Sequence, residues 1–426
     1  MIRVYSNPPR QEWDVLTARA MSDRGTAINA TVAKIIERVR YSGDEALVEL
    51  SREIDGVELS DFLVSESEIA AANNKISSEL KQAIGRAYDN IQKFHAAQVF
   101  TPIEIETTPG VHCSQRAVPI ARIGLYIPGG TAPLFSTVLM LGVPAAVAGC
   151  PEVVMCSPPD GQGHVAPEIL YTASLCGVKH IYKIGGAQAI AAMAYGTQSI
   201  AKVDKIFGPG NRYVTAAKQQ VGGSVVAIDM PAGPSEVMIL ADQSADAAFV
   251  AADMLSQVEH GADSQAIAVC QDEEFASEIK NHLARQLVAL DRVSIAAKAL
   301  ENSKIIVITD RDEVIAFANA YASEHLIISM EEPWDVARQI TAAGSVFIGN
   351  YTPESAGDYA SGTNHTLPTS GLARSMSGVN LDSFTHKITY QTITRQGLAA
   401  LAPTIITMAD GEGLTAHAMA VKQRLK

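Results

Sequence analysis

The first hundred residues carry apolar positions at helical spacing. Between positions 11 and 98, Val32, Ile36 and Val39 share one stripe, which predicts amphipathic helices. Pro102 ends this pattern, and β-type residues follow up to Pro119. From position 122 onward, short apolar runs end in glycine and are followed by helical stretches. This alternation of strand, glycine turn and helix predicts a parallel sheet with a ligand crevice at the carboxyl ends of its strands.

Three strand–turn–helix units lie at 122–130, 180–186 and 205–210, each leading into a helix. Glycine turns let backbone amides at a helix start approach phosphate, so a dinucleotide is a reasonable ligand. The usual G-x-G-x-x-G fingerprint is absent, because Gly161-Gln-Gly163 lacks a third glycine and Gly208-Pro-Gly210 contains a proline. Such turns also occur merely as connections, so the pattern leaves nucleotide binding open.

A second α/β unit follows, with strands expected near 237–240, 266–270, 305–309, 326–329 and 345–348. Its pattern fails over the polar stretch 351–371, which holds Glu354, Asp358 and His365. These side chains can bind a metal or move protons. A solvated surface loop is the alternative.

The apolar helix before Gly261 is predicted to begin at Ser244 as N-cap. Gln257 and His260 are three positions apart, which places both side chains on one helix face about 5 Å from each other. An imidazole and an amide oxygen so placed form half of a metal site. They can equally be a capped helix end.

The last fifty residues again look helical, with a hinge around Glu412. In the final helix His417 shares an apolar stripe with Leu414, Val421 and Leu425. His417 is therefore expected to face a packed surface, either as a ligand or as a satisfied interface residue. A short tail helix of this kind often docks on a partner subunit.

Composition narrows the function classes. The 426 residues contain 33 Lys and Arg against 46 Asp and Glu, a net charge of -13, so no nucleic-acid partner is expected. The most apolar run, 135–150, is short and broken by Gly142 and Pro144, and the first residues do not resemble a secretory signal, so no membrane partner is expected. Five cysteines without a C-x-x-C pair indicate a reduced, cytoplasmic protein.

Seven long segments in a fixed order resemble the histidinol dehydrogenase family, over nearly the whole chain from about position 28 to 424. The segments are Gly124-Leu-Tyr-Ile-Pro-Gly-Gly130, Lys205-Ile-Phe-Gly-Pro-Gly-Asn211, Ile228-Asp-Met-Pro-Ala-Gly-Pro-Ser-Glu236, Leu255-Ser-Gln-Val-Glu-His260, Ser323-Glu-His-Leu326, Pro353-Glu-Ser-Ala-Gly-Asp-Tyr-Ala-Ser-Gly-Thr-Asn-His365 and Leu414-Thr-Ala-His417.

The resemblance implies an α/β fold of two incomplete Rossmann-like domains with short helical N- and C-terminal additions. The expected parts are an N-terminal arm (1–21), a discontinuous α/β domain with most of the metal and catalytic site (22–125 and 235–378), a Rossmann-like NAD-contacting domain (126–234) and a C-terminal helical tail docking on the partner subunit (379–426). The family lacks the usual dinucleotide fingerprint too.

The resemblance also implies roles for individual residues. The expected ligands of one zinc ion per subunit are Gln257, His260, Asp358 and His417, the last from the other subunit of a homodimer with a shared active site. Without a thiolate, this donor set would also accept manganese or cobalt. Glu324 and His325 match the catalytic acid/base pair. Ser235, His365 and Glu412 match substrate contacts, and the metal ligands and His325 are also expected to contact the substrate. Tyr126, Gln188 and Asn211 match NAD contacts.

The expected reaction is the NAD-dependent oxidation of L-histidinol through L-histidinal to L-histidine, the last step of histidine biosynthesis. Histidine can take the hydroxyl proton at neutral pH, so His325 is the expected base. No cysteine falls in a matching motif, so Glu324 is expected to activate water for the second oxidation. The alternatives are a dehydrogenase of another small polar alcohol, such as a sulfonated diol, and a catalytically silent metal- or nucleotide-binding protein.

Overall fold

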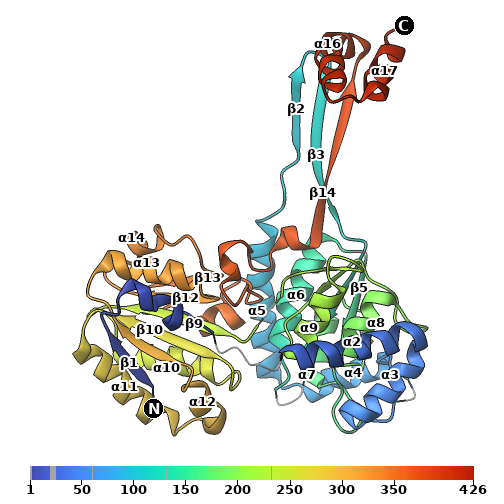
Figure 1. Cartoon of the computed structure of the whole chain (residues 1–426). Coiled ribbons are helices and arrows are strands. Elements are labelled where there is room, and N and C mark those ends of the chain that lie inside the picture. Colours follow the sequence, from blue (N-terminus) through green and yellow to red (C-terminus); the bar gives the residue numbers. More distant parts are fainter. Residues whose placement is uncertain (1, 20–24, 60, 130–131, 232) are drawn as a thin grey trace.

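Two parallel sheets and a protruding β arm organise the chain (Figure 1). The computed structural model describes residues 2–19, 25–59, 61–129, 132–231 and 233–426. The predicted α/β class with two Rossmann-like sheets is confirmed. The predicted boundary between residues 21 and 22, and Gly130 and Ala232 within two of the motifs, lie outside the described residues.

The five-stranded sheet contains the three predicted strand–turn–helix units. Its order is β6 (His180–Tyr182), β5 (Glu152–Cys156), β4 (Arg122–Tyr126), β7 (Lys205–Phe207) and β8 (Ala227–Ile228), and the paired strands run parallel. The chain proceeds from β4 to β5 and β6, then returns to β7 on the other side of β4. The connections reverse between β4 and β7, and ligands of open α/β sheets bind at the carboxyl ends of strands at such a point.

Helices of the first hundred residues pack on this five-stranded sheet. They are α2 (Gly25–Ser42), α3 (Asp44–Leu50), α4 (Glu66–Lys75) and α5 (Ser78–Ala96). Val32 and Leu47 share a core with Ile190, and Ile91 shares a second core with Ile123. The packing therefore differs from the predicted grouping of 22–125 with 235–378. An apolar helix stripe shows which face is buried but not which sheet covers it, so local spacing could not settle this point.

The six-stranded sheet forms the second unit. Its order is β1 (Arg3–Ser6), β11 (Lys304–Val307), β10 (Gln265–Cys270), β9 (Glu236–Ala241), β12 (His325–Ser329) and β13 (Ser345–Ile348), again with parallel pairing. The five predicted strands of this unit are all present. The expected N-terminal arm differs: it contributes the edge strand β1 and the short helix α1 (Trp13–Leu16), both packed on this unit.

The helices between these strands complete the two layered units. On the five-stranded sheet they are α6 (Phe135–Ala148), α7 (Pro167–Leu175), α8 (Gly186–Tyr195) and α9 (Arg212–Val221). On the six-stranded sheet they are α10 (Ala247–Val258), α11 (Glu273–Leu287), α12 (Val293–Ala299), α13 (Arg311–Tyr321), α14 (Pro333–Ala337) and α15 (Glu354–Tyr359). The most apolar run of the sequence is α6, which is largely buried although Pro144 lies inside it. Among the described residues, no helix combines the length and hydropathy needed to cross a membrane.

The β arm carries the C-terminal helices away from both sheets (Figure 1). It pairs β2 (Ile103–Thr108), β3 (Val111–Pro119) and β14 (Thr385–Ile393) in antiparallel order, and α16 (Arg395–Gly411) and α17 (Thr415–Arg424) follow at its tip. The expectation of a purely helical tail was wrong, because β14 precedes the helices. Its sequence, Thr-His-Lys-Ile-Thr-Tyr-Gln-Thr-Ile, is rich in β-branched and aromatic residues, which favour a strand.

The base of the arm is anchored by an aromatic pair. Phe384, directly before β14, stacks on Phe207 of β7 with ring centroids 4.3 Å apart and an interplanar angle of 9°. Both side chains are fully buried.

Replacing Phe384 by alanine should therefore lower the free energy of unfolding by about 3–5 kcal/mol, the usual cost of deleting a buried aromatic ring. Ile393→Ala, at a position 39% exposed at the end of β14, is the control and should change the free energy by less than about 1 kcal/mol. Urea unfolding followed by circular dichroism measures both. Equal losses would show that the ring pair is not the anchor.

Candidate active site

The predicted catalytic pair lies at the amino end of one strand, and the predicted substrate contact Ser235 lies at the amino end of its neighbour. Glu324 immediately precedes β12 and His325 is its first residue, while Ser235 immediately precedes β9. His325 stands beside Val237 in the ladder, so the starts of β9 and β12 lie next to each other. Glu324 accepts a hydrogen bond of 2.9 Å from the backbone N–H of Glu236, which fixes its carboxylate over this edge of the sheet.

Helix α10 returns to the same edge because it runs opposite to the strand before it. Its N-cap is Asp246, which accepts from the N–H of Ala248, and the predicted cap Ser244 instead donates to Asp242. At the other end Gln257 is fully buried and His260, just beyond the helix, is exposed in the single chain. The predicted pair thus reaches the catalytic edge.

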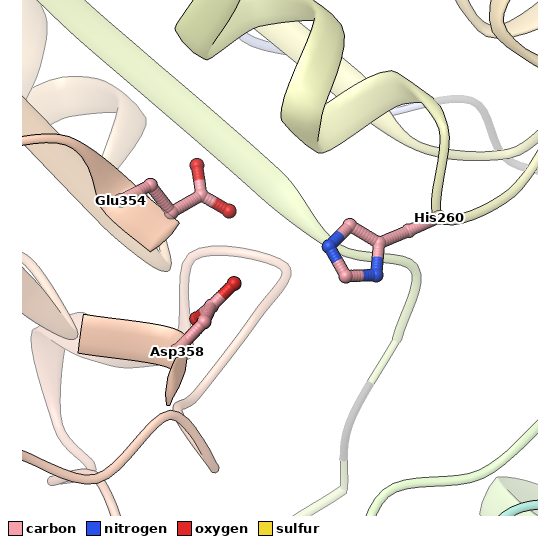
Figure 2. Close-up of side chains that lie close together, drawn as sticks. All are labelled: His260, Glu354 and Asp358. Atoms are coloured by element: carbon pink, nitrogen blue, oxygen red, sulfur yellow. The ribbon is translucent and has the colours of Figure 1, made fainter. Parts of the chain in front are cut away.

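The polar segment after β13 contains helix α15, which brings two carboxylates into the site. Glu354 and Asp358 are four positions apart and therefore share one face of this helix. Figure 2 shows both carboxylates and the His260 imidazole pointing toward one another. One ligand atom from each of the three lies within 4.8 Å of the others. Glu354 is fully buried, so the solvated-loop alternative is wrong at this position.

The side chain of Gln257 provides a test of whether this cluster suits a cation. Its amide oxygen faces both oxygens of the Glu354 carboxylate at 2.5 and 3.0 Å, a contact between acceptors. Turning the amide by 180° makes both contacts hydrogen bonds donated by nitrogen. In the turned orientation Glu354 holds the amide nitrogen, and the amide oxygen faces away from the carboxylate, as a ligand to a cation would. Oxygen and imidazole-nitrogen donors without a thiolate fit zinc, manganese or cobalt.

His325 lies among three carboxylates. Its Nδ1 is 3.7 Å from Glu324 and 3.6 Å from Glu354, and its Nε2 is 3.5 Å from Asp358. Neither ring nitrogen has a hydrogen-bond partner within the described part of the chain. Burial lowers the pKa of His325, but Glu354, Glu324 and Asp358 outweigh it and raise the pKa to about 10. Burial also raises the pKa of Glu324 to about 8, so this carboxyl group titrates close to neutral pH.

His365 connects this cluster to the other sheet. Its Nδ1 donates to the backbone carbonyl of Asp358 at 2.9 Å, and its Nε2 lies 3.4 Å from the hydroxyl of Thr137 on α6. With Nδ1 protonated, Nε2 is left as an acceptor for that hydroxyl. Burial lowers the pKa of His365, which favours this neutral form.

Glu412 and His417 do not lie in this cluster. Both are exposed at the tip of the β arm, on α16–α17, away from α10 and α15 (Figure 1). The packed surface that His417 is expected to face is therefore not provided by its own chain. The chain itself brings together Gln257, His260 and Asp358 of the predicted ligands.

Glu354 is the member of this cluster that was not predicted as a ligand. It was one of the metal-binding candidates of the polar stretch 351–371, and its position four residues before Asp358 was the further local sign.

The three predicted NAD contacts lie at the carboxyl edge of the five-stranded sheet. Tyr126 ends β4, and its hydroxyl accepts from the N–H of Gly186 at the start of α8. Gln188 is fully buried and donates to Asp55 at 3.2 Å, a neighbour that the sequence did not indicate. Asn211 caps α9 by accepting from the N–H groups of Tyr213 and Val214. All three residues belong to strand and helix ends next to the reversal between β4 and β7.

The two regions adjoin. Arg212, at the start of α9, forms an ion pair of 2.6 Å with Asp263, three residues after His260. Thr137 and His365 make the second connection, described above. The carboxyl edge of one sheet therefore meets the amino edge of the other, with the reversal point between β4 and β7 on one side and the histidine–carboxylate cluster on the other. This arrangement is that of a dinucleotide-dependent oxidoreductase.

Comparison with known proteins identifies the family. The sequence model of the histidinol dehydrogenase family matches residues 18–425. A histidinol dehydrogenase of Bacteroides thetaiotaomicron is 54% identical over 425 residues, covering 100% of this chain and 99% of that protein. One of Vibrio parahaemolyticus is 50% identical, covering 99% and 98%. The crystal structure of histidinol dehydrogenase from Elizabethkingia anophelis superposes with a TM-score of 0.96 at 52% identity, covering 100% of this chain and 98% of that one.

The chain belongs to the histidinol dehydrogenase family and is an NAD-dependent oxidoreductase. A more distant likeness concerns the fold alone. A betaine aldehyde dehydrogenase of Staphylococcus aureus superposes with a TM-score of 0.50 at 13% identity, covering 90% of this chain and 86% of that one.

Proposed function

We propose that this enzyme oxidises L-histidinol through L-histidinal to L-histidine with two molecules of NAD, the last step of histidine biosynthesis. The observation that carries the proposal is the buried Glu324–His325 pair, which lies beside the histidine–carboxylate cluster and next to the dinucleotide crevice. An alcohol held by that cluster would present its reacting carbon to the nicotinamide of NAD, which takes the hydride from that carbon.

Gln257, His260 and Asp358 would hold one zinc ion per subunit, together with His417 from a second copy of this chain. When bound, zinc supplies a site for the imidazole and amine nitrogens of the substrate. Glu354 contacts Gln257 and would orient its amide toward the ion. Ser235, His365 and, from the second copy, Glu412 would contact the substrate. Tyr126, Gln188 and Asn211 would contact NAD.

His325 would take the hydroxyl proton while hydride leaves the adjacent carbon for the nicotinamide. A cation bound among the surrounding carboxylates would lower the pKa of His325 toward the range of a useful base. Glu324 would then take a proton from the water that adds to the aldehyde, and a second hydride transfer from the hydrate gives the carboxylate.

A thiol route is disfavoured on physical grounds. Burial raises the pKa of Cys156, Cys176 and Cys270 to about 12 and that of Cys150 to about 11, so their thiolate forms are scarce at neutral pH. Cys113 lies on strand β3 of the arm.

All five cysteines are free, which supports a cytoplasmic location.

A homodimer with shared sites would bring the arm tip to the catalytic edge. Glu412 and His417 lie together at that tip, and Met408, Leu414 and Met419 beside them are 62, 43 and 49% exposed. Apolar side chains gathered on a protruding element suit an interface with a second copy.

The reaction can be tested by its stoichiometry. Each histidinol should yield two NADH, read at 340 nm, and a strong chelator should abolish turnover until zinc is restored. One NADH with free aldehyde accumulating would contradict the two-step reaction. A panel of other small polar alcohols is the control for substrate class, and histidinol should exceed them by orders of magnitude in kcat/KM.

The roles of the site residues can be separated by metal analysis. His325→Ala and Glu324→Gln should each lower kcat by about 100-fold or more, the usual effect of removing a general base, with the metal content intact. His260→Ala should lose most of its metal on dialysis because it lacks a ligand. Zinc loss in His325→Ala would place that imidazole among the ligands instead.

Shared sites predict complementation between two inactive variants. His417→Ala and Asp358→Ala each damage a different half of the same site, so mixed dimers contain one undamaged site. After denaturation and joint refolding, the mixture should recover about a quarter of the wild-type activity, since half the dimers are mixed and each holds one intact site. Each variant refolded alone is the control. No recovery would mean that His417 serves the site of its own chain.

A further inference from the structure

A buried ion pair beneath the dinucleotide crevice has no role in the reaction described so far. Lys218 on α9 and Asp229 after β8 form this pair, and their side chains are 2% and 1% exposed. Withdrawing two charges from water costs free energy that their attraction does not regularly recover. A pair of this kind is therefore weak evidence of stability. Its contacts indicate what it does.

Both charges are bound to a single glycine. The ammonium group of Lys218 donates to the carbonyl of Gly208 at 2.8 Å, and the carboxylate of Asp229 accepts from the N–H of Gly208 at 2.8 Å. Asp229 also accepts from the N–H of Met230 at 2.6 Å, which holds the carboxylate at the end of β8. The orientation of Gly208 is thus set from both sides by buried groups.

Gly208 is the residue that shapes the turn at the reversal point. It follows β7 directly and has a φ of +124°, and a Cβ at this position would lie 2.1 Å from the carbonyl oxygen of Tyr126. The turn then passes through Pro209 and Gly210 to Asn211, the cap of α9. A fixed Gly208 therefore fixes the position of Asn211 relative to Tyr126.

We propose that Lys218 and Asp229 are positioning residues for NAD: by holding Gly208 they set the turn 208–211 against the end of β4 and so determine the affinity for the dinucleotide. The inference rests on the proposed NAD contacts of Tyr126 and Asn211. It also explains how the Gly208-Pro-Gly210 segment can serve NAD although the segment lacks the glycine fingerprint and Pro209 has no backbone N–H. Rigid support from below takes the place of that fingerprint.

The test is the double variant Lys218→Met/Asp229→Asn. It removes both charges, keeps an acceptor for the N–H of Gly208 and leaves its carbonyl without a donor. The KM for NAD should rise about tenfold, while kcat and the KM for histidinol stay within about twofold. The melting temperature should remain within about 3 °C of the wild type, because a neutral pair carries no unpaired buried charge.

A matched control removes another ion pair from the same unit. Lys183 and Glu68 are 3.2 Å apart with side chains 13 and 29% exposed, and Lys183→Met/Glu68→Gln should leave all three kinetic constants unchanged. The single variant Asp229→Asn is a second test that keeps the donor to the Gly208 carbonyl but leaves the buried Lys218 charge unpaired, so its melting temperature should fall below that of the double variant. It should raise the KM for NAD about threefold at constant kcat.

An unchanged KM for NAD in both Asp229 variants would overturn the proposal, as would equal changes in all three constants with a lowered melting temperature. Asn211→Ala separates this failure from failure of the cofactor site itself. If Asn211→Ala raises the KM for NAD and the double variant does not, the positioning role alone is wrong. If neither variant changes it, the proposed NAD contacts are wrong too.

Discussion

The burial of several carboxyl groups around one imidazole is the constraint on which the site depends. Glu324, Glu354 and Asp358 surround the His325 imidazole at the amino edge of the six-stranded sheet, and Gln257 lies against Glu354. Such a group of carboxylates is costly to bury unless positive charge is supplied. A divalent cation bound among them would supply that charge and leave His325 free to act as a base. Strands β9 and β12 and helices α10 and α15 bring these side chains together at this edge.

Two opposite sheet edges meet at this place. The five-stranded sheet offers its carboxyl edge, where strand reversal leaves a crevice, and the six-stranded sheet offers its amino edge, where Glu324 and His325 begin a strand. Arg212 and Asp263 tie the two units together, as do Thr137 and His365. Hydride transfer needs the two reactants within contact distance. A site between two rigid sheets provides this without relying on a loop.

Buried charge occurs a second time in the chain with a different consequence. At Lys218 and Asp229 the charges balance each other and are directed at one peptide unit. At His325 the carboxylates outnumber the imidazole. An ion pair whose charges cancel can hold a backbone segment in place. A group with more carboxylates than cations can instead bind a positively charged ligand.

The sequence by itself determined the α/β class, the glycine turns of the five-stranded sheet and the five strands of the second unit, because these depend on local periodicity. It also placed Gln257 beside His260, since helical spacing fixes that neighbourhood. Strand β14 carried a local signal in its threonines and isoleucines that was not recognised. Only the tertiary structure decided which sheet helices α2–α5 pack on, because an apolar stripe shows which helix face is buried but not which surface covers it. It likewise decided that Glu354 joins the cluster and that His417 stands far from it, because contacts between distant segments depend on packing rather than on spacing along the chain.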